Sequence, residues 1–234
     1  MSYTGIMING TDTLEQWGLI LLDDLTIEEA KLKSVLIDVP GADGELNASY
    51  GMTGGVPVFS SRQLSFTLFA SGLSKAGGVL THGTPPKEEA VNLIRTQLQG
   101  RYHGREVEVI LPDDPTHYFR GILSVGVKSK YNSGRIPITL QAFPYRLKTE
   151  STVVEETIPQ GGSTTITLEN EQRRVVPTIT VSAETTIRKG DRTWTIQAGT
   201  RVIPGLYLDA GSTELAVSGT GGATISFLYQ EGRL

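Results

Sequence analysis

The stretch that decides the fold is residues 35–70, VLIDVPGADGELNASYGMTGGVPVFSSRQLSFTLFA. It opens with an apolar run at 35–39 and closes on the alternating residues Leu64, Phe66 and Leu68. Both patterns are typical of β-strands. The sequence therefore predicts two strands separated by an extended middle segment.

The middle segment, residues 40–59, is rich in turn formers and poor in side chains that a core could bury. Pro40-Gly41 and Asp43-Gly44 are turn dipeptides, because proline presets φ near −65° and glycine accepts a positive φ. We predict an arm that packs poorly on its own body and needs a partner surface. A surface loop without a partner is the alternative, since long loops are either functional or disordered.

The rest of the N-terminal part predicts a β-rich domain with one helix. Residues 85–99 carry an apolar stripe at helical spacing, with Thr84 as the expected cap and Gly100 as the expected stop. Strands are expected where apolar residues alternate, at 106–111, 118–127 and 136–142. Pro137 places the last of these at a sheet edge or a bulge. Residues 26–34 fit a capped helical turn or a strand about equally well.

After residue 146 the sequence changes in character. Residues 147–234 are rich in Thr, Gly and Val, with short alternating runs every eight to twelve residues. That rhythm predicts a β-sandwich. The fold class is thus mainly β, with an N-terminal domain at 1–146 and a β-sandwich at 147–234.

Composition limits the classes of function. The 234 residues carry a net charge of −4 and no cysteine, which excludes disulfides and thiolate metal sites. The basic residues are not concentrated, so no nucleic-acid-binding surface is predicted. No apolar run approaches the ~18 residues of a membrane span, and no cleaved signal is recognised. We expect a protein made in the cytosol and not inserted into a membrane.

No catalytic, cofactor-binding or metal site is predicted. His82, His103 and His117 are scattered, without the spacing of metal ligands. The pairs Asp23-Asp24 and Asp113-Asp114 adjoin turns, where Asp bonds its own backbone. Trp194 is a candidate saccharide contact, because an indole face can stack on a sugar ring. Its alternation with Ile196 instead favours a core position.

Several short motifs together resemble one family along nearly the whole chain. They are Ile8-Asn9-Gly10, Trp17-Gly18-Leu19, residues 37–44 (IDVPGADG), Ser61-Arg62, Gly100-Arg101, Asp113-Asp114, Tyr118, Gly121, residues 142–145 (AFPY) and residues 227–234 (FLYQEGRL). In order and spacing they resemble the distal tail proteins of siphophages and related prophages, the Dit family of tail-tip or baseplate hubs.

The resemblance implies a structural role in the virion tail tip and no enzymatic activity. Such proteins form homohexameric rings that join the tail tube protein to the tail-associated or tail-fibre protein, and DNA passes through the lumen without specific binding. Their C-terminal galectin-like domain can carry a receptor-binding protein. By the same resemblance, the arm would contact a neighbouring subunit through Val39, Pro40, Gly41, Asp43, Gly44, Tyr50, Val56 and Phe59.

Three other functions remain open from the residues alone. A carbohydrate-binding module would recognise a host-wall sugar through Trp194, and a tube subunit would share the β-plus-helix body but form long polymers. A cell-wall hydrolase would need paired carboxylates or a nucleophile in a cleft, and the sequence offers no convincing set.

Overall fold

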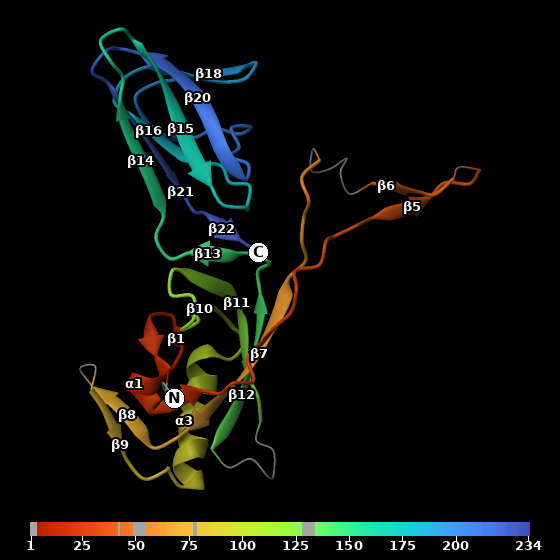
Figure 1. Ribbon diagram of the computed structural model, residues 1–234, viewed down its shortest axis with the longest axis vertical. Helices are drawn as coiled ribbons and strands as arrows, with labels where there is room; N and C mark the ends of the chain where they lie inside the picture. The colour runs from red at the N-terminus through yellow and green to blue at the C-terminus, as the bar shows by residue number, and fades with distance from the viewer. Residues whose placement is uncertain (1–3, 42, 49–54, 77–78, 128–133) are drawn as a thin grey trace. The chain divides into compact units, whose positions relative to one another are not determined.

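The chain folds as two units, Met1–Pro144 and Tyr145–Leu234 (Figure 1). The computed structural model describes the whole chain except residues 1–3, 42, 49–54, 77–78 and 128–133. Both units are built mainly of β-strands, as predicted.

The N-terminal unit is centred on an antiparallel sheet in the order β2-β1-β10-β11-β12-β7-β3, with β4 also paired to β7. Its strands are β1 Met7–Ile8, β2 Thr11–Asp12, β3 Leu19–Leu21, β4 Thr26–Ile27, β7 Arg62–Ala70, β10 Arg105–Ile110, β11 His117–Val125 and β12 Arg135–Ala142. Along β7 and β12 every second residue is buried, so one face of the sheet forms the core.

Helix α3, Glu88–Tyr102, packs on that core through Val91, Leu98 and Tyr102. It begins later than the predicted 85–99 and continues past Gly100. Pro86 disfavours helical geometry at Pro85, so the helix starts only after the two prolines, and Lys87 occupies the cap position without a side-chain bond. Leu93, whose spacing places it in the apolar stripe predicted for residues 85–99, is exposed instead.

A second helix, α1 Thr13–Trp17, was not predicted. The Asp12 carboxylate caps it by accepting hydrogen bonds from the backbone N–H of Leu14 at 2.8 Å and of Glu15 at 3.4 Å. Gly18 ends it with φ +64°. Trp17 then packs edge-on against Tyr102 of α3, at 6.2 Å between ring centroids, which anchors α1 to the longer helix.

Pro137 does not lie at an edge, because β12 pairs with β11 on one side and β7 on the other. Thr67, opposite Pro137 on β7, turns its backbone groups away, to Leu22 N and Asp24 Oδ1. On the other side, β11 ends at Val125. A longer β11 would need a backbone N–H from the residue at position 137, which proline lacks. A proline is therefore tolerated in a strand that is paired on both sides.

The C-terminal unit is a β-sandwich of two four-stranded antiparallel sheets, β14-β21-β16-β19 and β15-β20-β17-β18. Their strands are β14 Thr152–Thr157, β15 Ser163–Asn170, β16 Thr178–Val181, β17 Thr185–Lys189, β18 Arg192–Ile196, β19 Gly199–Val202, β20 Gly211–Gly219 and β21 Thr224–Tyr229. Inward residues of both sheets, such as Phe227 and Leu215, share one core. Strands β13 Arg146–Lys148 and β22 Gly232–Arg233 pair at one end of this unit.

Candidate intersubunit arm

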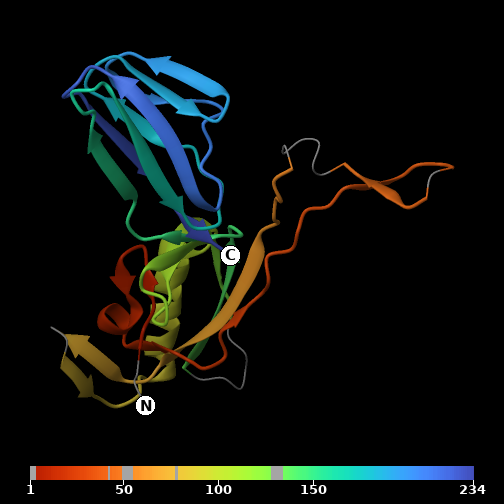
Figure 2. The ribbon, with the colours of Figure 1, turned by 45° about the horizontal axis from the view of Figure 1, so that its top comes forward.

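The arm leaves the main sheet beside β7 and returns to the start of the same strand (Figures 1 and 2). After β4, the Glu28 N–H donates to Gln63 O at 2.9 Å, the last contact with β7 before the chain departs. The region that fitted either a helical turn or a strand, residues 26–34, is thus extended, and its backbone bonds to other strands.

Two limbs of the arm run side by side and hold each other. Near the base, the Lys33 N–H donates to Val58 O at 2.7 Å and the Ser60 N–H to Lys31 O at 2.8 Å. Further out, β5 Leu36–Asp38 pairs with β6 Glu45–Asn47 in a short antiparallel hairpin. In the described part of the arm, the two limbs are therefore held together by backbone hydrogen bonds to each other.

The side chains of the arm, in contrast, lack a surface to cover them. Leu36 is 51% exposed and Ile37 46% exposed. Other large apolar residues of the two limbs that are exposed are Leu32, Val35, Val39 and Val58. An isolated two-stranded hairpin is marginally stable in water, and a run of exposed apolar residues marks an interaction surface. The arm is thus the strongest candidate for a contact with another protein chain.

The distal hairpin is acidic. Asp38 and Glu45 stand opposite each other in register, Asp43 lies in the turn between them, and the sequence has no Lys or Arg from 34 to 61. Like charges placed directly opposite across a strand pair are destabilising. A surface that receives this hairpin would have to offer apolar contact together with neutral or positive groups.

Seven of the eight arm residues assigned from the resemblance lie in the described part of the chain. Val39, Pro40, Gly41, Asp43 and Gly44 form the exposed turn of the hairpin, where Gly41 has φ +85° and Gly44 φ +76°. Val56 and Phe59 are half-buried, and Phe59 forms a bridge with Leu32. Tyr50 lies outside the described residues.

The strand predicted at 35–39 is confirmed as β5, but the sequence did not show that it belongs to the arm, which was predicted to begin at residue 40. Its apolar run looks like a core strand, and only the acidic, glycine-rich continuation distinguishes it. In the structure this run is exposed and pairs with the arm's own return limb rather than with the main sheet.

Several of the residues considered for chemistry have structural partners. His103 Nδ1 accepts from the Val125 N–H at 3.0 Å, and His117 Nδ1 lies 3.2 Å from Asp114 Oδ1. Asp24 Oδ1 accepts from the Thr67 N–H at 2.9 Å, so it bonds a distant strand and not its own turn. Within the described ranges, no group of three or more His, Asp or Glu side chains is arranged to hold a metal ion.

Trp194 is half-buried and packs against the core of the sandwich, on the same side of β18 as Ile196. Its register partner on β17, Ile187, is fully buried. Separately, no helix among the residues that the structure describes is both long and apolar enough to cross a membrane.

Comparison with known proteins found a similar structure but no matching sequence family. No family model matches the chain. No curated protein matches it either. Among solved structures, the chain is similar to the Dit protein (gp 19.1) of phage SPP1, with a TM-score of 0.61 over 98% of this chain and 99% of that one, at 13% identity. That protein is described as a paradigm of the hub adsorption apparatus in phages that infect Gram-positive bacteria. The likeness establishes a Dit-like fold.

Proposed function

We propose that the protein is a structural hub of a phage or prophage tail tip. In this role, N-terminal units associate into a homohexameric ring between the tail tube protein and the tail-associated protein. The observation that carries the proposal is the arm. Its described limbs pair with each other, but most of their large apolar side chains are exposed, so we infer that a neighbouring copy covers them.

Head-to-tail contacts of this kind close into a ring when the rotation between copies permits. The arm of one chain and its receiving surface on the next are different patches, as a heterologous contact requires. The fold similarity supports the same role, since it extends over both units and the neighbour is described as a hub.

We also assign the sheet face opposite the core of β7 and β12 to the lumen of the ring. Most of its side chains on these strands are uncharged: Gln63, Ser65, Thr67, Pro137, Thr139 and Gln141. Phe69 and one cation, Arg135, lie at the end of this face. Strong phosphate binding needs several Lys or Arg contacts, because each neutralised phosphate releases counterions. A face with a single cation on these two strands therefore suits DNA passage without specific binding.

The C-terminal sandwich, which we propose to be galectin-like, would lie outside the ring and carry a receptor-binding protein. The proposal places the protein at the virion tail tip and gives it no catalytic role. It does not require Trp194, whose packing against the core does not favour the sugar-binding alternative.

Negative-stain electron microscopy of the purified protein tests this function. The proposal expects particles with sixfold symmetry and a central opening. Long polymers would indicate a tube subunit instead, and isolated 25.3-kDa particles would contradict the hub assignment.

A further inference from the structure

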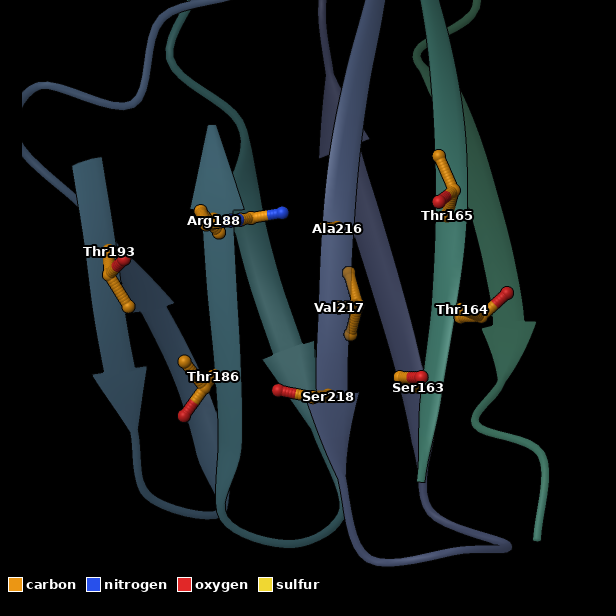
Figure 3. Close-up of a pocket in the computed structure, with 9 residues that line it drawn as sticks. All are labelled: Ser163, Thr164, Thr165, Thr186, Arg188, Thr193, Ala216, Val217 and Ser218. Atoms are coloured by element: carbon orange, nitrogen blue, oxygen red, sulfur yellow. The ribbon is translucent and has the colours of Figure 1, made fainter. Parts of the chain in front are cut away.

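A hollow of about 510 Å³ lies on the outer face of the β15-β20-β17-β18 sheet (Figure 3). On these strands Ile166, Leu215 and Ile187 point into the core, so the alternate residues face outward. Two neighbouring register rows form the hollow. The first row holds Ser163, Ser218 and Thr186, and the second holds Thr165, Ala216, Arg188 and Thr193. The Thr186 hydroxyl is also hydrogen-bonded to that of Thr195, its neighbour in the first row, at 3.0 Å.

The hollow is created by the smallest side chain in the second row. Ala216 stands between Thr165 on one neighbouring strand and Arg188 on the other. Its methyl group leaves the centre of the face open, and Figure 3 shows the Arg188 side chain pointing from β17 toward it. Hydroxyl-bearing side chains surround this floor on both sides.

Two other cations of this unit, unlike Arg188, are paired with a carboxylate. Lys189 pairs with Asp209 at 3.8 Å, and the Arg174 Nε donates to Asp209 Oδ1 at 2.5 Å. The Arg188 side chain makes no hydrogen bond or ion pair with any residue that the structure describes. The residues lining the hollow include no carboxylate, and the nearest acid along β20, Glu214, lies one register row beyond it, opposite Thr167.

These groups define the chemistry of a ligand. A guanidinium presents N–H donors in a planar fork that matches a carboxylate or a phosphate. Each Ser or Thr hydroxyl offers one donor and two acceptor lone pairs, which match the hydroxyl groups of a sugar. No aromatic residue lines the hollow, so binding would depend on hydrogen bonds and charge and not on ring stacking.

We propose that this hollow binds an anionic saccharide. Arg188 holds the carboxylate or phosphate over Ala216, and the Ser and Thr hydroxyls of the neighbouring strands bind the sugar hydroxyl groups. The inference goes beyond the proposed function, because the hollow is complete within one C-terminal unit and does not require a ring.

Saturation-transfer NMR on the full-length protein tests the proposal with three probes at equal concentration. Trigalacturonate supplies carboxylates, glucose 1-phosphate supplies a phosphate, and maltotriose is the neutral reference. We expect saturable binding of at least one anionic probe, weakening as salt is added, and no saturable binding of maltotriose. The anionic probe that binds more tightly identifies the charged group.

Three variants locate the site. Arg188→Gln removes the cation and should lower the affinity roughly tenfold or more, as expected for the loss of a charge-assisted hydrogen bond. Ala216→Leu fills the floor and should lower it similarly. Arg201→Gln, an exposed arginine on β19 of the other sheet, is the matched control and should bind as the wild type does.

The proposal is overturned if neither anionic probe binds, if maltotriose binds as well as they do, or if Arg188→Gln retains wild-type affinity. Equal loss in Arg201→Gln would show diffuse attraction to the whole unit and would overturn it as well. Circular dichroism of each variant shows that the fold is kept. The mass of the particle in solution reports on the ring separately, so the two proposals can fail independently.

Discussion

Replacing Glu231 by glutamine should loosen the C-terminal unit in a pH-dependent way. The Glu231 side chain is only 8% exposed and accepts from Lys148 Nζ at 2.8 Å, from the Glu171 N–H at 3.1 Å and from the Thr152 hydroxyl. It thereby ties the end of the chain to the first strands of the same unit.

Burial alone would raise the pKa of Glu231, but the hydrogen bonds from Lys148 and Thr152 and the Lys148 charge outweigh it and hold the pKa below the ordinary 4.5. The folded pKa is therefore lower than the unfolded one. The stabilisation is complete above the unfolded value and is lost as the pH falls through the folded value.

Glutamine keeps an acceptor oxygen but removes the charge. A hydrogen bond to a charged group contributes about 1.5–3 kcal/mol. Lys148 is 39% exposed and regains water when its partner is neutral, so we expect a loss of about 2 kcal/mol, near the lower end of that range. For a unit of this size, Tm should fall by roughly 8–16 °C if it unfolds independently.

Thermal unfolding at pH 7 and at pH 3, followed by circular dichroism, measures both effects. Glu156→Gln, an exposed glutamate on β14, is the control for the change of net charge. The difference between Glu231→Gln and the wild type should be large at pH 7 and shrink at pH 3. The account of the Glu231 hydrogen bonds would be refuted if Glu231→Gln were as stable as the wild type at pH 7. It would also be refuted if the difference in Tm between the two proteins were as large at pH 3 as at pH 7.

Three further substitutions test other parts of the structure. Trp17→Ala removes the contact with Tyr102 and the hydrogen bond from Trp17 Nε1 to Gln97, and urea unfolding should show a loss of about 2–3 kcal/mol for this half-buried indole; an unchanged midpoint would contradict its anchoring role. Gly18→Ala would place a Cβ 2.4 Å from the Leu73 carbonyl oxygen at φ +64° and should cost about 2 kcal/mol or more, whereas Gly10→Ala, at φ +73° with open space around it, should cost clearly less; equal losses would remove the steric argument. Leu36→Lys combined with Ile37→Lys should leave the stability of the single chain within about 0.5 kcal/mol, because both side chains are exposed, but should prevent assembly; a variant that still assembles would show that these residues are not at the interface.

The sequence predicted strands correctly where the alternation of apolar residues matches the burial of one strand face. The alternation of Leu64, Phe66 and Leu68 predicted β7 because one face of that strand is buried along its whole length. The same reasoning placed Trp194 and Ile196 on one side of β18. Alternation reports burial directly, so it succeeds when a single core decides which face points inward.

Sequence-based prediction failed where the structure of a residue depends on segments that are distant in the sequence. Pro137 suggested an edge, but whether a proline is tolerated depends on where β11 ends and where Thr67 directs its backbone groups. The search for alternating runs in the C-terminal part did not find strand β19, because its four residues are all exposed and show no alternation.

The arm could be predicted only in part. Its turn was evident from Pro40-Gly41 and Asp43-Gly44, whereas Leu36 and Ile37 read as an ordinary apolar strand. Their exposure becomes visible only when the partner strand is known to be β6 and not β7. An exposed apolar strand residue such as Leu36 has the same sequence signature as a buried one.

The central claim is that sister copies cover this arm around a common axis, and the mass of the particle in solution tests it most directly. Light scattering coupled to gel filtration should give six 25.3-kDa chains, about 152 kDa, or twice that for two stacked rings. The Leu36→Lys/Ile37→Lys protein should elute as a folded monomer, while Val153→Lys, which alters a similarly exposed valine of the C-terminal unit, should retain the wild-type mass. A wild-type protein that stays at 25.3 kDa at high concentration would contradict the account.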